Sequence, residues 1–171
     1  FLTSSIFGQH MADDDPADYT WNPVSDTADF MVYLIRPKAE SLNAYFMLTS
    51  SVLGLKLTSS VYPKIYDNER WNLAVRIKPE HFAIDGGIGT STAPDYDVEF
   101  YGVNHSLDVL ENEFSLSASV SNALGSAFVS SHKRVYMGAH RQNFTGAVGH
   151  ETDLKLGSLR VWMDYLNDDV I

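Results

Sequence analysis

The chain has 171 residues, of which 44% are hydrophobic, and this suits one globular domain with a core of its own. Its formal net charge of −10 disfavours nucleic acids and anionic membranes as partners, because binding to either depends on basic side chains. Cysteine is absent, so disulfides, thiolate catalysis, zinc–cysteine sites and iron–sulfur clusters are excluded, and no apolar run is long enough to predict membrane insertion.

Short runs of alternating or β-branched residues predict strands throughout the first two thirds of the chain. Period-two patterns rich in Val, Ile, Tyr and Phe, separated by polar turns, are typical of a sandwich or a barrel. In chain order, the predicted strands are Phe1–Phe7, Phe30–Leu34, Ala44–Leu48, Leu53–Leu57, Trp71–Ile77, Asp97–Val103 and Phe114–Val120.

The last third predicts three more strands and one helix. The strands are Ala127–Val129, Arg134–Ala139 and Leu154–Met163, the last with a β-bulge where its alternation slips by one residue. The segment Asp164–Ile171 predicts a short C-terminal helix, with Asn167 as its N-cap. Two long loops, Met11–Pro23 and Ile84–Tyr96, are candidates for a functional role.

The order of motifs in the last third resembles the C-terminal signature of laminin G-like domains. RVYMGA at Arg134–Ala139 is followed by FTGAV at Phe144–Val148 and then by LKLGSLRVWMDYLNDDVI at Leu154–Ile171. Upstream, ERWNLAVRI at Glu69–Ile77 is similar to the Trp-centred strand of that family. The resemblance implies an antiparallel jelly-roll β-sandwich of the concanavalin A/laminin G-like type, with one short C-terminal helix.

The expected organisation is one laminin G-like domain that spans residues 1–171. The chain starts with Phe1 inside a predicted strand, so we expect it to be a piece of a longer protein. Similar domains are embedded in large phage structural proteins, and the lack of cysteine agrees with assembly in a reducing cytosol. The expected location is therefore a virion or the extracellular space.

The strongest enzymatic pattern is DYDVEF, which places Asp95, Asp97 and Glu99 at alternate positions. Retaining glycosidases of the laminarinase/lichenase type carry three carboxylates with this spacing on one strand, one as the nucleophile and one as the acid/base. Here an aspartate stands where the nucleophilic glutamate belongs, and its side chain is one methylene shorter. The pattern therefore favours a solvated strand face, and a catalytic role for these residues is the alternative.

Other candidate sites have less support from the sequence. Aromatic side chains that could stack on a sugar include Trp21 and Tyr101. The six histidines show no zinc-hydrolase spacing, and the acidic run Asp13–Asp18 lacks the spacing of an EF-hand. We expect no cofactor, and calcium is the one ion that the resemblance leaves open, because laminin G-like domains often bind it.

The sequence predicts a non-catalytic recognition or structural module of a larger virion or extracellular protein. Such a module acts in adhesion or assembly, and its expected partners are protein subunits of the assembly and, as a further class, glycans. Two alternatives stay open because one fold hosts all three functions. They are a lectin-like domain that binds glycans and a glycoside hydrolase of the laminarinase/lichenase type.

Overall fold

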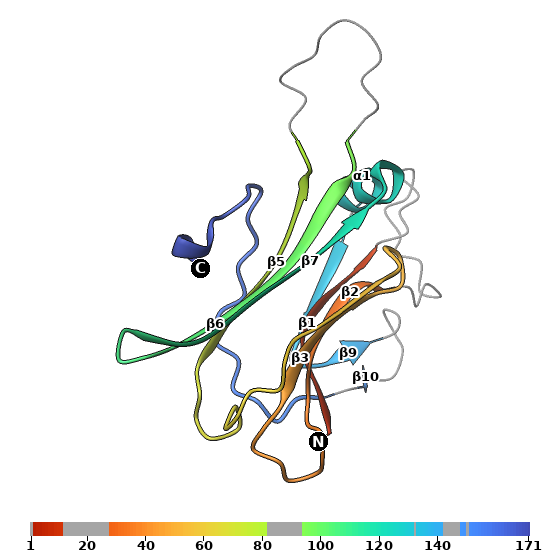
Figure 1. Ribbon diagram of the computed structural model, residues 1–171. Helices are drawn as coiled ribbons and strands as arrows, with labels where there is room; N and C mark the ends of the chain where they lie inside the picture. Colours follow the sequence, from red (N-terminus) through yellow and green to blue (C-terminus); the bar gives the residue numbers. More distant parts are fainter. Residues whose placement is uncertain (1, 12–27, 82–93, 132, 142–147, 150) are drawn as a thin grey trace, which may run out of the picture. The chain divides into compact units, whose positions relative to one another are not determined.

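The computed structural model describes residues 2–11, 28–81, 94–131, 133–141, 148–149 and 151–171 (Figure 1). Its elements are mostly β-strands, and every pair of strands in its sheets is antiparallel. The prediction of an all-β, antiparallel fold is therefore confirmed. The chain divides into two compact units: Phe1–Glu69 with Ser131–Arg160, and Arg70–Ser130 with Val161–Ile171.

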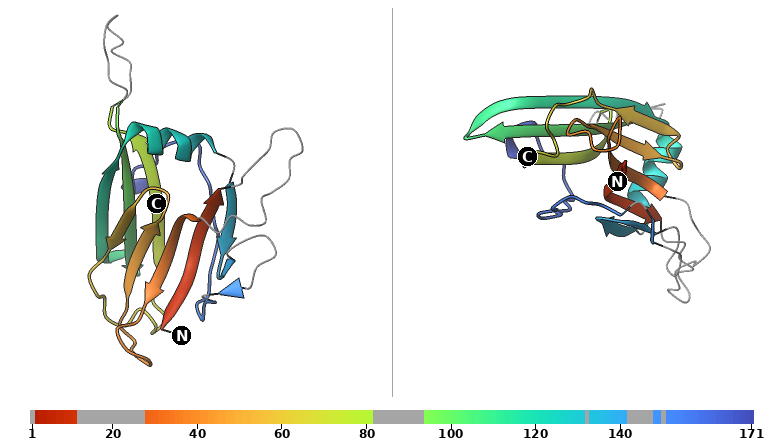
Figure 2. Two further views of the ribbon diagram at one scale, coloured as in Figure 1. Left: turned by 90° about the vertical axis from the view of Figure 1, so that its right-hand side faces the viewer. Right: turned by 90° about the horizontal axis from the view of Figure 1, so that it is seen from below.

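The first unit contains a five-stranded sheet in the order β4-β3-β2-β1-β8 (Figure 2). A small ladder of two strands, β9 and β10, belongs to the same unit. The bounds are β1 Thr3–Met11, β2 Ala28–Ile35, β3 Tyr45–Ser50, β4 Leu55–Thr58, β8 Lys133–Met137, β9 His140–Arg141 and β10 Val148–Gly149.

The core of this unit follows the alternation that the sequence predicts. In β3, Phe46 and Leu48 are buried, and they pair across the sheet with Leu34 and Val32 of β2. All four side chains are at most 2% exposed. Complete burial of such a side chain contributes about 1.5–3 kcal/mol, so this block is a main source of the unit's stability.

The second unit contains the three-stranded sheet β5-β6-β7, and helix α1 follows its last strand. The bounds are β5 Trp71–Pro79, β6 Tyr96–Ser106, β7 Val109–Val120 and α1 Asn122–Ser130. Residues directly opposite each other in an antiparallel ladder point to the same face. The register therefore separates the sheet into one apolar and one polar face.

Aromatic side chains dominate the apolar face of β5-β6-β7. Phe100 is completely buried, and its ring meets that of Phe114 edge to face with centroids 5.0 Å apart. Trp71 lies beside Phe114 at a centroid distance of 6.1 Å. The neighbouring Gly102 is required here, since a Cβ atom at this position would overlap the Phe114 ring.

Helix α1 corrects the prediction of a strand at Ala127–Val129, because these residues lie in its last turns. The contacts at its start are made by residues far away in sequence. The Asp95 carboxylate accepts a hydrogen bond from the Asn122 backbone N–H at 2.9 Å, which satisfies a donor at the N-terminus. Gly125 packs directly against the Tyr96 ring and leaves no room for a side chain. Short apolar runs do not distinguish helix from strand by pattern alone.

The C-terminal segment corrects two further predictions. Residues Leu154–Met163 form no strand, although their side chains alternate, so the predicted β-bulge is absent as well. The predicted helix over Asp164–Ile171 is reduced to one 3₁₀ turn, η2, at Asp168–Val170. Within this segment, Trp162 is 59% exposed and lies outside the core.

Both predicted long loops fall mainly outside the described residues. Met11 ends β1, but the rest of the loop Met11–Pro23, with Trp21 and the acidic run, is not described. Of the loop Ile84–Tyr96, only Pro94, Asp95 and Tyr96 are described.

Candidate functional site

One face of the β5-β6-β7 sheet brings together three of the candidate residues that the sequence singled out, Asp97, Glu99 and Tyr101. In the register, Arg76 pairs with Glu99 and Glu99 pairs with Ser117, so these three side chains share one face. Strand alternation then fixes the other members of this face. We call the part of this face around Glu99 the polar face, made up of Ala74, Arg76, Lys78, Asp97, Glu99, Tyr101, Ser115, Ser117 and Ser119.

Arg76 is the centre of the polar face. It is 8% exposed, which is unusual for an arginine and requires partners for its charge. Its Nε lies 3.3 Å from Oε2 of Glu99, and its Nη1 pairs with the Asp168 carboxylate. The same Nη1 donates to the Leu166 carbonyl at 2.9 Å. Arg76 therefore joins strand β6 to the C-terminal segment.

Two tyrosine rings lie close to the same guanidinium. Its central carbon is 5.2 Å from the ring centroid of Tyr101 and 5.1 Å from that of Tyr165. Distances under about 6 Å allow cation–π attraction. The ammonium of Lys78 is 4.5 Å from the Tyr165 ring. These contacts hold the C-terminal segment on the polar face through Tyr165 as well as Asp168.

Three side chains contact the Glu99 carboxylate. Besides Arg76, it receives a 2.6 Å hydrogen bond from the Tyr165 hydroxyl, and Nζ of Lys78 lies 3.8 Å from its other oxygen. The hydrogen bond to Glu99 is the largest cause that raises the pKa of Tyr165, and burial adds to it. Tyr165 therefore remains a protonated donor at neutral pH, and its hydroxyl donates to the Glu99 carboxylate.

Tyr101, a predicted ligand-binding residue, is 3% exposed. Its hydroxyl donates to Oε1 of Glu113 at 2.9 Å. Burial, followed by this hydrogen bond, raises the pKa of Tyr101 to about 12. Because Tyr101 is buried, no face of its ring is accessible for a sugar to stack on. The other predicted ligand-binding residue, Trp21, lies outside the described residues.

The three alternating carboxylates, Asp95, Asp97 and Glu99, lie in different places in the fold. Asp97 and Glu99 share the polar face, as their spacing predicts. Asp95 lies just before β6 begins, and its carboxylate is bonded to the start of helix α1. The row of three that a retaining glycosidase uses is therefore divided between a sheet face and a helix terminus.

The polar face thus combines a neutralised ionic centre with a row of hydroxyls. Ser115, Ser117 and Ser119 are exposed along β7, beside Asp97. Such a surface can donate and accept hydrogen bonds, but its central carboxylate already has cationic and phenolic partners. Sequence patterns did not single out Arg76, Tyr165 or Asp168. A single arginine inside an otherwise apolar alternation, WNLAVRI, was the available signal.

Metal binding has no candidate within the described part of the chain. Among those residues, no group of three or more His, Asp or Glu side chains lies close enough together to hold a metal ion. The acidic run Asp13–Asp18 is not among them, so calcium binding by that run stays a prediction.

A second polar cluster lies in the first unit. Asp153 accepts a 3.0 Å hydrogen bond from Ser4, which is completely buried, and its other oxygen lies 3.1 Å from Nη2 of Arg36. The Arg36 guanidinium stacks on the Tyr66 ring at 3.4 Å, and the Tyr66 hydroxyl is 3.3 Å from Ser4 Oγ. The cluster fastens the segment around Asp153 to strand β1.

The Asp153 contacts make stability depend on pH. Burial opposes ionisation of this carboxyl, but favourable interactions, among them the Ser4 hydrogen bond and the charge of Arg36, lower its pKa overall. A lowered folded-state pKa contributes stability that is present above the unfolded value, about 3.9, and is lost as pH falls through the folded value. We expect Asp153→Asn to lower the melting temperature at pH 7, with the difference from the native chain shrinking below about pH 4. Thermal unfolding across pH tests this, and a difference that grows on acidification would contradict it.

Comparison with known proteins returns no relative: no family model, no curated protein and no solved structure matches the chain. Within the described residues, no helix is both long enough and apolar enough to cross a membrane.

Proposed function

We propose that this chain is a non-catalytic recognition or structural module of a larger virion or extracellular protein, acting in adhesion or assembly. In this proposal the two antiparallel sheets pack as a jelly-roll β-sandwich of the concanavalin A/laminin G-like type. Its partners are protein subunits of the same assembly.

The observation that carries the proposal is the set of contacts made by the Glu99 carboxylate. A glycosidase needs one carboxylate free to attack or to exchange a proton with the sugar, about 5–5.5 Å from its partner in a retaining enzyme. Glu99 instead lies between Arg76, Lys78 and the Tyr165 hydroxyl. These partners contact both carboxylate oxygens, which suits a structural ion pair better than a carboxylate that attacks a sugar or exchanges a proton with it.

Glycan binding is the second candidate, and the exposed serine row supports it. Ser115, Ser117 and Ser119 line up beside Asp97, and hydroxyl and carboxylate groups are common partners of sugar hydroxyls. Because Tyr101 is buried, this candidate depends on hydrogen bonds more than on stacking.

The decisive experiment is hydrolysis of a panel of β-glucans and galactans by the native chain and by Glu99→Gln. We expect no turnover by either protein. Turnover by the native chain that disappears in Glu99→Gln would overturn the proposal in favour of the glycoside hydrolase.

A glycan array with the native chain and Ser117→Leu separates the remaining two candidates. The assembly role predicts no specific signal on the array. Specific binding that Ser117→Leu abolishes would select the lectin-like alternative. Circular dichroism of both proteins serves as the control for folding.

A further inference from the structure

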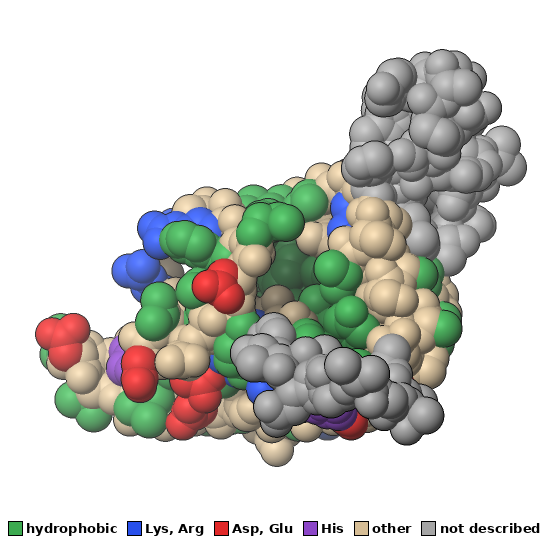
Figure 3. Space-filling view, turned by 90° about the horizontal axis from the view of Figure 1, so that it is seen from above, with side chains coloured by type: hydrophobic (Ala, Val, Ile, Leu, Met, Phe, Trp, Pro, Cys, Tyr) green, Lys and Arg blue, Asp and Glu red, His purple; other side chains and the backbone are tan. Residues whose placement is uncertain are grey.

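The tip of the β6–β7 hairpin carries apolar side chains into solvent. Strand β5 pairs with β6 only as far as Asn104, so the hairpin continues beyond it as two strands. At its end, Leu107 is 96% exposed, Val109 64% and Leu110 51%. Figure 3, in which this hairpin forms the left end, shows hydrophobic and acidic side chains gathered there.

The turn itself presents Leu107 outward. Leu107 and Asp108 both have positive φ angles, 48° and 64°, as the two central residues of a type I′ hairpin turn require. Asn-Gly and Asp-Gly are the residue pairs that favour this turn, because Asn, Asp and Gly tolerate positive φ angles. A leucine in the left-handed region is strained. Backbone strain is concentrated at functional sites, so a strained and fully exposed leucine at the end of a hairpin points to a binding role for this tip.

The charges around the tip restrict the chemistry of that partner. Asp108 and Glu111 flank the apolar side chains, and the sequence has no Lys or Arg between Lys78 and Lys133. An anionic surface would repel this tip. The complementary surface is an apolar hollow with a basic side chain at its rim.

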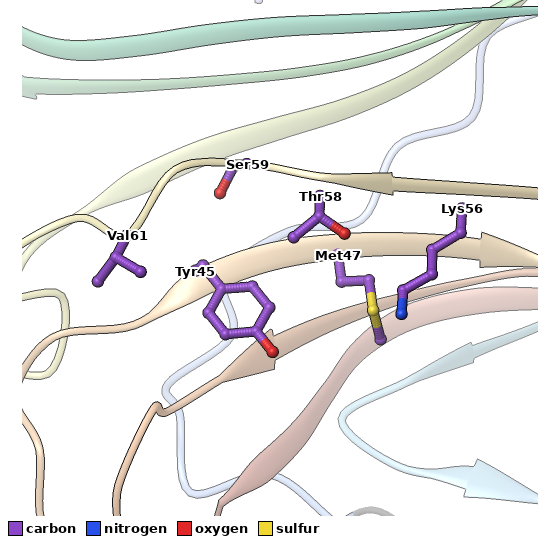
Figure 4. Close-up of a pocket in the computed structure, with 6 residues that line it drawn as sticks. All are labelled: Tyr45, Met47, Lys56, Thr58, Ser59 and Val61. Carbon is purple, nitrogen blue, oxygen red and sulfur yellow. The ribbon is translucent and has the colours of Figure 1, made fainter.

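The chain offers such a hollow on strands β3 and β4. It has a volume of about 230 Å³, large enough for one branched aliphatic side chain, and Tyr45, Met47 and Val61 supply its apolar lining. Lys56 stands at the rim, and Figure 4 shows that its side chain points to the same side as those of Tyr45 and Met47. Within the described residues, Lys56 forms no ion pair.

We propose that the hairpin tip of one copy docks into the β3–β4 hollow of a second copy. Leu107 enters the hollow, and Asp108 faces Lys56 at its rim. The two surfaces differ, so copies join either as a reciprocal pair, with each tip in the hollow of the other copy, or head to tail in series. This proposal deepens the assembly role and rests on it, because it supplies the surface by which copies of the module contact one another.

The test is sedimentation velocity at loading concentrations from about 10 µM to about 1 mM, the range in which small interfaces associate. The native chain should show a weight-average sedimentation coefficient that rises with concentration. Asp108→Lys, Lys56→Glu and Leu107→Ser should each remove that rise. The matched controls Asp67→Lys and Lys38→Glu change the same charges at other exposed positions and should keep it.

Mixing two variants makes the test specific. Asp108→Lys and Lys56→Glu, each monomeric alone, should associate with each other when mixed. The altered tip of the first then meets the altered hollow of the second, and the native tip of the second meets the native hollow of the first. A native chain that sediments as a monomer throughout, or a mixture that stays monomeric, would overturn the proposal. Hydrolysis of glucans would instead overturn the proposed function and leave the sedimentation result unchanged, so the two failures are distinguishable.

Discussion

Arg76→Met is expected to lower the free energy of unfolding by about 3–5 kcal/mol, the range for breaking a buried ion pair by removal of one partner. The substitution leaves Glu99, whose side chain is 18% exposed, without its closest cation. It also removes the contacts that hold Asp168 and the Leu166 carbonyl on the polar face. Denaturant unfolding followed by tryptophan fluorescence measures the loss.

The matched control for Arg76 is Lys78→Met. Lys78 is 30% exposed and lies 3.8 Å from Glu99, so its contribution is expected to stay below about 1 kcal/mol. Equal losses in the two variants would contradict the central position of Arg76.

Phe100→Ala is expected to cost about 3–5 kcal/mol, the range for truncating a buried aromatic side chain. Phe100 is completely buried, and its removal leaves Phe114 without its edge-to-face neighbour. Trp162→Ala is the comparison, because Trp162 is 59% exposed and should change stability by less than about 0.5 kcal/mol. A larger loss of unfolding free energy in Trp162→Ala than in Phe100→Ala would contradict a core that contains Phe100 and excludes Trp162.

The strands that pair with neighbours close in sequence could be predicted from alternation. β5 and β6 agree with the predicted runs because apolar and polar residues alternate in both, and the polar face follows from the same alternation. The spacing of Asp97 and Glu99 therefore predicted correctly that their side chains share a face.

Contacts between distant segments could not be predicted in this way. Asp168 lies 92 residues from Arg76, and no local pattern connects them. Helix α1 was missed because the Asp95 carboxylate and the Tyr96 ring, both outside the helix, support its first turns. The Leu154–Met163 segment alternates like a strand, but a strand also requires a neighbour for its backbone hydrogen bonds, and the pattern does not supply one.

The central claim is that Glu99 stabilises the fold by its ion pair with Arg76. A double-mutant cycle tests this claim most directly. Arg76→Met, Glu99→Gln and the double variant are unfolded in denaturant beside the native chain, and the coupling free energy is calculated from the four stabilities. We predict a coupling of about 1–3 kcal/mol, with the double variant losing less than the sum of the single losses. Additive losses, within about 0.5 kcal/mol, would contradict the structural ion pair and leave Glu99 free for another role.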